Sequence, residues 1–199
     1  YYACGPTIIH AMKKLGFNVF LDLKLHDIPH QIRGAAASAA REGADMITMH
    51  TLGGKQMLVA GQEGVAEVCQ SEGRENTITL GITVLTSMDN EALAQVGISR
   101  TAAEQVDLLA NVAKESGISG VVASPQEASM LRKILGPDAY IVTPGVRPKG
   151  SDKGDQSRIA TPAEAFAAGA SHIVIGRPIT QADDPAAAFD AIAAELDAL

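Results

Sequence analysis

The sequence predicts an α/β fold built on a parallel sheet, and two observations carry that prediction. Short β-rich runs alternate with helical stretches, and repeating βα units of roughly 25–40 residues imply parallel strands joined by right-handed crossovers. Polar residues follow at least four of these runs. Because a closed barrel gathers the carboxyl ends of all its strands into one site, we favour a (β/α)₈ barrel of the TIM type over an open doubly wound sheet.

Six strands are expected from runs rich in β-branched and apolar residues. They cover residues 19–24, 46–50, 78–85, 120–123, 140–143 and 172–175. No Gly-x-Gly-x-x-Gly motif follows any of them, which argues against a dinucleotide-binding open sheet. A barrel of this type needs about 250 residues, with about 200 near the lower limit. We therefore expect residues 1–199 to form a single barrel domain that is N-terminally incomplete, with the first one or two βα units absent.

Capping residues predict where several helices begin and end. Ser124-Pro-Gln-Glu127 and Thr161-Pro-Ala-Glu164 each combine an N-cap hydroxyl, a proline at the first helical position and a glutamate three residues after the cap. This combination predicts a capping box in both places. Gly136 and Gly169 are expected to end the two helices, and Asp184-Pro185 to open the last one.

Composition limits the classes of partner. The chain of 199 residues carries a formal net charge of −7, so nonspecific binding to nucleic acid or to an anionic membrane surface is not expected. No apolar run approaches the length of a membrane span. Cys4 and Cys69 form neither a disulfide framework nor a Cys-x-x-Cys motif. A reducing cytoplasm is the expected location.

The first expected strand ends in charged residues. Side chains two positions apart on a strand share a face, so Asp22 and Lys24 point one way and the leucines around them the other. Asp27 falls just past the strand, and Pro29 fits the first turn of the next helix. This pattern suits a barrel strand whose outer face meets helices and whose last inner residues open into an active site. Taken alone, Asp-x-Lys fits a surface ion pair equally well.

A phosphate pocket is expected near the last two strands. The final strand leads into Gly176-Arg177, where a glycine allows close backbone approach to an anion and an arginine can bind it with two hydrogen bonds. The strand before it ends in Thr143-Pro-Gly-Val-Arg147, and a polar loop over residues 151–156 follows. Barrels often place a phosphate at the loops after their seventh and eighth strands.

The segment Phe20–Pro29, with its Asp-x-Lys-x-x-Asp spacing, resembles the signature of the orotidine 5′-monophosphate decarboxylase family. Further motifs occur in the family's order, and the resemblance extends from Gly5-Pro6 to the last helix, over nearly the whole chain. These motifs are Leu85-Thr-Ser87, Thr143-Pro-Gly-Val-Arg147, Gly154-Asp-Gln156, Arg158-Ile159 and Ile175-Gly-Arg-Pro178.

The resemblance implies conversion of orotidine 5′-monophosphate to uridine 5′-monophosphate in pyrimidine biosynthesis, without a cofactor or a metal. It implies that Lys24 donates the proton and that Asp22 and Asp27 are its flanking carboxylates. It further implies a homodimer in which Asp27 reaches into the neighbouring subunit's site. The family usually has Asn-Thr after Asp-Ile-Pro, whereas this chain has His30-Gln31, so no ligand contact is carried over to position 31.

Substrate-binding residues are also implied by the resemblance. Thr86 and Ser87 would contact the substrate around the pyrimidine, and Pro144 belongs to the same substrate-binding set. The residues expected to hold the phosphate side are Arg147, Gln156, Gly176 and Arg177. The five histidines show no compact spacing of metal ligands, which agrees with a reaction that needs no metal.

The expected chemistry suits a lysine between carboxylates. Decarboxylation leaves a carbanion at C6 of the pyrimidine, which must be stabilised and then protonated. Nearby carboxylates keep a lysine charged, and the resulting ammonium is a proton source held at one point. Two alternatives remain open: a sugar-phosphate decarboxylase or aldolase of the same barrel superfamily, which would use magnesium, and a noncatalytic phosphate-binding barrel fragment.

Overall fold

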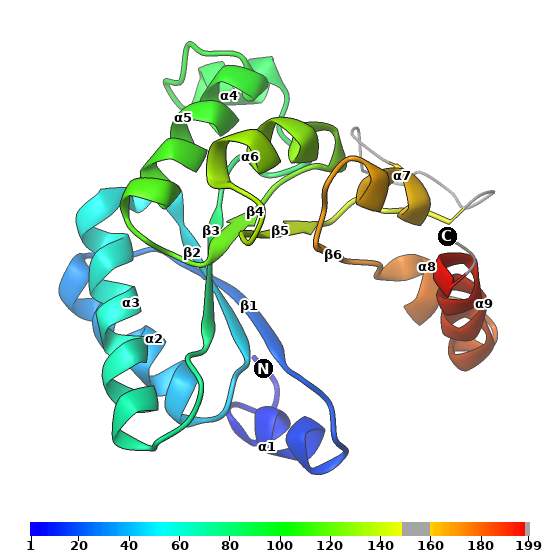
Figure 1. Ribbon diagram of the computed structural model, residues 1–199, viewed down its shortest axis with the longest axis horizontal. Helices are drawn as coiled ribbons and strands as arrows, with labels where there is room; N and C mark the ends of the chain where they lie inside the picture. Colours follow the sequence, from blue (N-terminus) through cyan, green and yellow to red (C-terminus); the bar gives the residue numbers. More distant parts are fainter. Residues whose placement is uncertain (149–159, 198–199) are drawn as a thin grey trace. The chain divides into compact units, whose positions relative to one another are not determined.

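The computed structural model describes residues 1–148 and 160–197 and shows an α/β protein in which strands and helices alternate (Figure 1). The strands described follow one another in the sheet in sequence order, β1-β2-β3-β4-β5-β6. The pairings β1–β2, β2–β3 and β5–β6 are all parallel. The prediction of an α/β fold with a parallel sheet is confirmed. Six strands lie in the described residues, so the count of eight stays a prediction.

The strands are β1 (Phe20–Leu25), β2 (Met46–His50), β3 (Ile78–Ile82), β4 (Gly120–Val122), β5 (Tyr140–Thr143) and β6 (His172–Ile173). The α-helices are α1 (Thr7–Lys14), α2 (Pro29–Arg41), α3 (Gly54–Ser71), α4 (Asn90–Gln95), α5 (Ala102–Glu115), α6 (Ala128–Leu135), α7 (Pro162–Ala167), α8 (Arg177–Thr180) and α9 (Pro185–Asp197). Two 3₁₀ turns, η1 (Thr51–Gly53) and η2 (Pro125–Glu127), precede α3 and α6.

Two expected strands end two or more residues earlier than predicted. The prediction of a strand over residues 78–85 was wrong at its end, because the chain leaves β3 after Ile82 and turns where Met88 N donates to Leu85 O at 2.9 Å. The last strand was expected to run to residue 175 but ends at Ile173, although Val174 N still donates to Thr143 O at 2.9 Å. An apolar run predicts a strand without predicting where its partner stops pairing.

The chain divides into two compact units. The first comprises Tyr1–Ile82 and Asn111–Gly120, and therefore holds β1, β2 and β3 with helices α1 to α3. The second comprises Thr83–Ala110 and Val121–Leu199. The single-domain expectation for residues 1–199 stays a prediction.

Small residues bring the two main helices of the first unit close together. Ala36 and Ala40 of α2 are fully buried in a core that also contains Ile47 of β2. On α3, a Cβ added to Gly64 would lie 2.4 Å from Arg33 O, so only glycine permits this approach of the α2 backbone. The packing of α2 and α3 thus follows from residues without bulky side chains.

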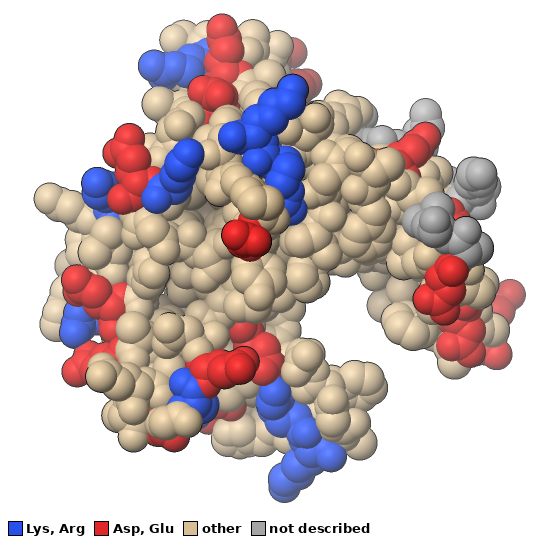
Figure 2. Space-filling model, in the orientation of Figure 1, with Lys and Arg blue, Asp and Glu red and all other residues tan. Residues whose placement is uncertain are grey.

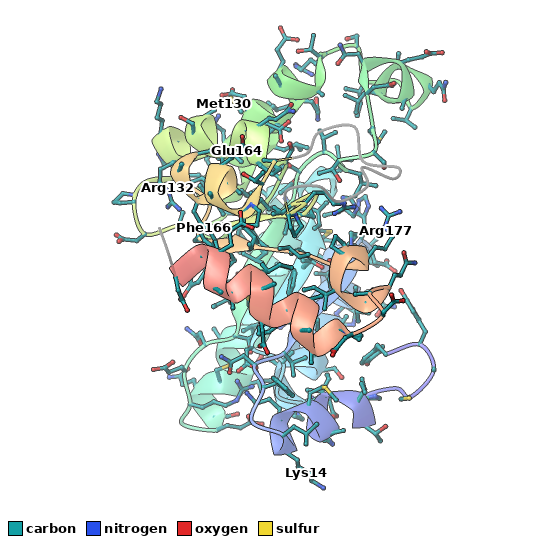
Figure 3. All side chains as sticks on the ribbon, turned by 90° about the vertical axis from the view of Figure 1, so that its right-hand side faces the viewer. Lys14, Met130, Arg132, Glu164, Phe166 and Arg177 are labelled. Atoms are coloured by element: carbon teal, nitrogen blue, oxygen red, sulfur yellow. The ribbon has the colours of Figure 1, made fainter. Side chains whose placement is uncertain are left out.

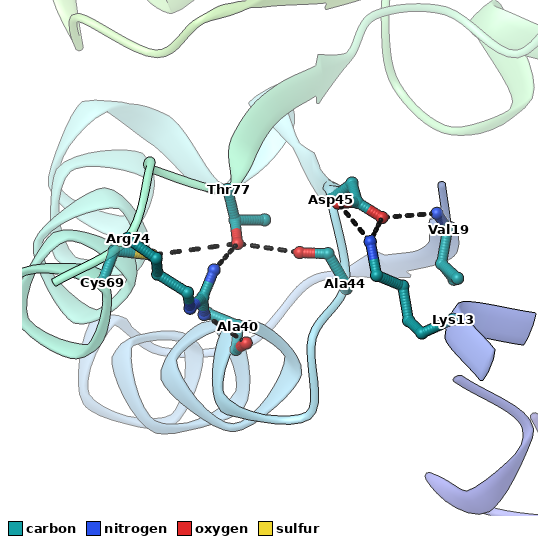
Figure 4. Close-up of polar contacts among 8 residues, drawn as sticks. All are labelled: Lys13, Val19, Ala40, Ala44, Asp45, Cys69, Arg74 and Thr77. Carbon is teal, nitrogen blue, oxygen red and sulfur yellow. Dashed lines mark hydrogen bonds and ion pairs between the residues drawn. The ribbon is translucent and has the colours of Figure 1, made fainter. Parts of the chain in front are cut away.

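Polar contacts fix the amino ends of β2 and β3 within the first unit (Figure 4). Asp45, just before β2, accepts hydrogen bonds from Lys13 Nζ at 2.8 Å and from Val19 N at 2.6 Å. Thr77, just before β3, is buried and donates to Ala44 O at 2.8 Å. These contacts hold the amino ends of the strands. The residues of the expected active site lie at the opposite, carboxyl ends.

The predicted capping residues of the second unit are confirmed. Ser124 and Thr161 both form complete capping boxes, with Glu127 and Glu164 as the respective partners. Gly136 ends α6 with φ +94°, in the left-handed region that favours glycine.

Arg132 of α6, labelled in Figure 3, stabilises the second unit through backbone carbonyls. Its guanidinium donates to Gly169 O at 2.8 Å, to Gly136 O at 2.9 Å and to Ala139 O at 2.8 Å. One side chain thus satisfies carbonyl groups at the ends of both α6 and α7. The predicted stop at Gly169, where φ is +106°, is confirmed.

Among residues 1–148 and 160–197, no helix is long and apolar enough to cross a membrane. On the face drawn in Figure 2, acidic and basic side chains are interspersed with uncharged residues.

Candidate active site

The charged end of β1 forms the centre of the candidate site in the first unit. Lys24 Nζ lies 2.5 Å from Asp22 Oδ2, which confirms that the two side chains share a face. Both are partly accessible, with side-chain exposures of 39% for Lys24 and 40% for Asp22. The pair therefore remains open to a ligand while the ammonium is held by an adjacent carboxylate.

The backbone of Lys24 departs from regular strand geometry. Its φ is +53°, and it is the one non-glycine residue with positive φ in the described parts of the chain. Leu21 pairs with Ile47 whereas Leu25 pairs with Met49, so four steps along β1 match two along β2. Left-handed backbone in a long-chain residue is uncommon and is found preferentially at functional sites. The irregularity re-aims the lysine at the end of the strand.

Thr48 of β2 joins both members of the pair and was missed by the sequence analysis. Its Oγ1 donates to Asp22 Oδ1 at 2.8 Å and accepts from Lys24 N at 2.9 Å. The side chain is fully buried. A polar residue within the apolar run 46–50, two positions before His50, was the available signal, because residues two apart on a strand share a face.

His50, at the end of β2, lies beside the same pair. Its ring centroid is 5.2 Å from that of His26, and its Nδ1 is buried without a hydrogen-bond partner in the described structure. Burial lowers the pKa of His50, and electrostatic interactions with His26 and Lys24 lower it further, against an opposing effect of Asp22. His50 is therefore favoured as a neutral imidazole next to the ammonium.

Asp27 lies just beyond β1, as predicted, and Pro29 occupies the first turn of α2. Asp27 is exposed, and its Oδ1 accepts a hydrogen bond from Ile28 N at 2.6 Å. Lys24, Asp27 and Gln31 all line an open pocket of about 540 Å³ between the end of β1 and the start of α2. The first unit thus brings a lysine and two carboxylates to one end of β1.

The substrate-binding residues implied by the resemblance belong to the second unit. Thr86 is half-buried and Ser87 exposed, in the turn after β3. Pro144 follows β5 and is half-buried. Arg147 is buried, with 7% exposure, and its Nη1 donates to Val146 O at 2.9 Å.

Gly176 and Arg177 lie where β6 leads into α8. Arg177 is exposed and is the first residue of that helix (Figure 3). Gly176 has φ −102°, and a Cβ added there would meet nothing within 4 Å, so neither backbone strain nor crowding within the chain requires glycine. Open space at this backbone is what a bound anion would need. Gln156, predicted to complete the phosphate side, lies outside the described residues.

No group of three or more His, Cys, Asp or Glu side chains is arranged to hold a metal ion in residues 1–148 and 160–197. The chemical groups gathered at β1 and β2 are an ammonium, carboxylates, a threonine hydroxyl and imidazoles. This set can hold and transfer a proton and can stabilise charge on a bound molecule.

Comparison with known proteins assigns the family. Residues 1–192 match the model of the Orotidine 5′-phosphate decarboxylase / HUMPS family. The chain belongs to this family. An orotidine 5′-phosphate decarboxylase of Moorella thermoacetica is 51% identical over 99% of this chain and 79% of its own length. One from Halorhodospira halophila is 50% identical over 98% of this chain and 80% of its own length.

Two solved structures agree with the fold. The crystal structure of orotidine 5′-phosphate decarboxylase from Lactobacillus acidophilus matches with a TM-score of 0.83 and 39% identity, over 96% of this chain and 80% of that one. An uncharacterized conserved protein from Geobacillus kaustophilus matches with a TM-score of 0.84 and 37% identity, over 98% of this chain and 83% of that one.

Proposed function

We propose that this protein decarboxylates orotidine 5′-monophosphate to uridine 5′-monophosphate, a step of pyrimidine biosynthesis, and is therefore a carboxy-lyase. Membership of the family and the names of relatives about half identical to the chain support this activity. The structural observation that supports decarboxylation most directly is the 2.5 Å contact between Asp22 and Lys24 at the end of β1.

In the proposed reaction, the bond between C6 and the carboxylate breaks, carbon dioxide leaves, and the electron pair stays on C6. Lys24 stabilises this carbanion through its positive charge and then transfers a proton from Nζ to C6. Asp22 holds the ammonium in position through their 2.5 Å contact and lies beside the departing carboxylate. Solvent then returns the proton to Lys24. No step requires a metal or an organic cofactor.

The phosphate of the substrate is assigned to residues of the second unit. Arg177 is exposed and cationic, Gly176 leaves its backbone open, and Arg147 offers a buried guanidinium. Gln156 completes this group. Thr86, Ser87 and Pro144 contact the substrate around the pyrimidine. Binding energy from the phosphate, remote from C6, then serves to hold the pyrimidine against Lys24.

The assembly that fits this activity is a cytoplasmic homodimer of single (β/α)₈ barrel domains. The sequential order of six parallel strands supports the barrel. Asp27 is exposed beyond the end of β1, which supports its role as the residue that enters the neighbouring subunit's site. Cys4 is exposed and Cys69 is buried, and both are free thiols. Free thiols are typical of proteins in a reducing compartment.

Direct assay tests the proposed function. The full-length protein is incubated with orotidine 5′-monophosphate, with and without a chelator, and substrate absorbance is followed as uridine 5′-monophosphate forms. We expect turnover that the chelator does not change. A protein that leaves this nucleotide intact would contradict the proposal. If it instead converts a sugar phosphate only when magnesium is present, it is a sugar-phosphate decarboxylase or aldolase of the same barrel superfamily.

A further inference from the structure

We propose that Thr48 is a positioning residue that sets both the carboxylate of Asp22 and the backbone of Lys24. The expected effect on kcat rests on the proposed function. The positioning role itself rests only on two hydrogen bonds of Thr48 Oγ1, at 2.8 Å to Asp22 Oδ1 and 2.9 Å to Lys24 N.

One of these bonds orients the carboxylate. Asp22 Oδ1 accepts from Thr48, which leaves Oδ2 directed at Lys24 Nζ at 2.5 Å. Without the hydroxyl, the carboxylate of a side chain that is 40% exposed would be free to rotate towards water. The ammonium would then lose its fixed partner and its fixed position.

The other bond holds the irregular backbone. Lys24 N has left the ladder with β2 at the point where the register shifts, and Thr48 Oγ1 accepts its hydrogen bond in place of a strand carbonyl. Left-handed backbone at a non-glycine residue costs about 1–3 kcal/mol and persists only where surrounding contacts enforce it. Thr48 is fully buried, so water cannot replace its hydroxyl in either role.

The matched variants are Thr48→Val, which removes the hydroxyl and keeps the shape, and Thr48→Ser, which keeps the hydroxyl. Thr79→Val is the control for the loss of a buried strand hydroxyl. Thr79 lies on neighbouring β3 with 1% exposure, and its partner is Ser119, away from the charged pair. All three are made in the full-length protein.

Two readouts separate positioning from general stability. Hydrogen exchange reports on the amide of Lys24, and steady-state kinetics with orotidine 5′-monophosphate reports kcat and KM separately. We expect Thr48→Val to speed exchange of the Lys24 amide by at least tenfold and to lower kcat about 10- to 100-fold, as lost hydrogen bonds to charged groups do. KM should change less than threefold. Thr48→Ser should restore both properties, and Thr79→Val should leave both near wild type.

Unchanged exchange of the Lys24 amide in Thr48→Val would overturn the proposal whatever the activity. Equal losses of kcat in Thr48→Val and Thr79→Val would overturn it as well, because they would indicate a general structural effect. If the wild-type protein does not turn over this nucleotide, the proposed function fails, and the exchange measurement still decides the role of Thr48.

Discussion

At the scale of single residues, the contact between Asp22 and Lys24 is better explained by chemistry than by stability. Both side chains are about two-fifths exposed, and ion pairs in such positions contribute only about 0–1 kcal/mol to folding. The left-handed backbone of Lys24 opposes folding by a similar or larger amount. The pair therefore adds little to folding, and its strained backbone is explained by a role in the reaction.

Phosphate recognition can be tested at Arg177. Replacing it by alanine should weaken binding of uridine 5′-monophosphate by about 1.5–3 kcal/mol, because a charge-assisted contact is lost. Uridine, which lacks the phosphate, should bind as before. Calorimetric titration of both ligands measures the difference, and Arg41→Ala, at an exposed position of α2, is the control. Equal losses for the two ligands would remove Arg177 from the phosphate site.

His50 and His172 predict how stability depends on pH. Burial lowers the pKa of both imidazoles from the ordinary value of 6.5. At these two histidines, the unfolded chain therefore binds more protons than the folded one between the lower folded-state pKa and about pH 6.5. Stability from these residues is fully present above pH 6.5 and is lost as pH falls through the lower folded-state pKa.

The variant His50→Gln tests this dependence. Its free energy of unfolding in urea should fall less steeply than that of the wild type between pH 6.5 and 5. The exposed residue His30, changed to glutamine, is the control and should leave the slope unchanged. A wild-type slope in His50→Gln would show that His50 does not couple folding to protonation.

The sequence was sufficient to place Asp22 and Lys24 on one face, because the two-residue period of a strand is local. It was not sufficient to find Thr48. That contact depends on how β1 and β2 align across 26 residues of chain, and on a register shift that no local pattern predicts. The positive φ of Lys24 escaped prediction for the same reason, since lysine has no intrinsic preference for it.

At the scale of secondary-structure elements, helix starts were predicted well because they depend on a few adjacent residues. The boxes at Ser124 and Thr161 formed as expected. The ends of β3 and β6 were predicted too late, because pairing with a neighbouring strand stops before the apolar run does. The apolar residues of α9 are only partly buried, with Ile192 inside and Phe189 58% exposed.

The capping box of α7 gives a prediction for stability. Thr161→Ala removes the hydroxyl that accepts from Glu164 N and should lower stability by about 0.5–2 kcal/mol. Thr161→Ser keeps the hydroxyl and should stay close to the wild type. Thermal unfolding of the two variants makes the comparison, and equal melting temperatures would show that the cap contributes nothing measurable.

At the scale of the whole molecule, the parallel order of the strands was predictable because alternating βα units permit few topologies. Closure into eight strands and dimerisation depend on pairings between distant segments or separate chains. These stay predictions. The carboxyl end of β1 carries Asp22 and Lys24, and that of β2 carries Thr48 and His50, as the barrel prediction requires of an active-site face.

The proposed homodimer with shared sites predicts complementation between two inactive variants. Subunits with Lys24→Ala would lack the proposed proton donor, and subunits with Asp27→Ala would lack the residue proposed to enter the neighbouring site. One of the two sites in a mixed dimer would contain both wild-type groups, so mixing should restore activity. Verified mixed dimers that stay inactive would refute the shared site and leave Asp27 with a role in its own subunit.

In the proposed reaction, decarboxylation depends on the ammonium of Lys24. The most direct measurement is the turnover of orotidine 5′-monophosphate by full-length Lys24→Ala, beside Lys55→Ala, whose lysine is exposed on α3 and lies 4.0 Å from Glu115. We expect Lys55→Ala to match the wild type. Lys24→Ala should fold normally and lose at least about 10²–10⁴-fold in kcat, the usual effect of removing a positioned acid. Retention of more than roughly a tenth of wild-type turnover by Lys24→Ala would exclude Lys24 as the proton donor, because a positioned proton donor contributes more than that.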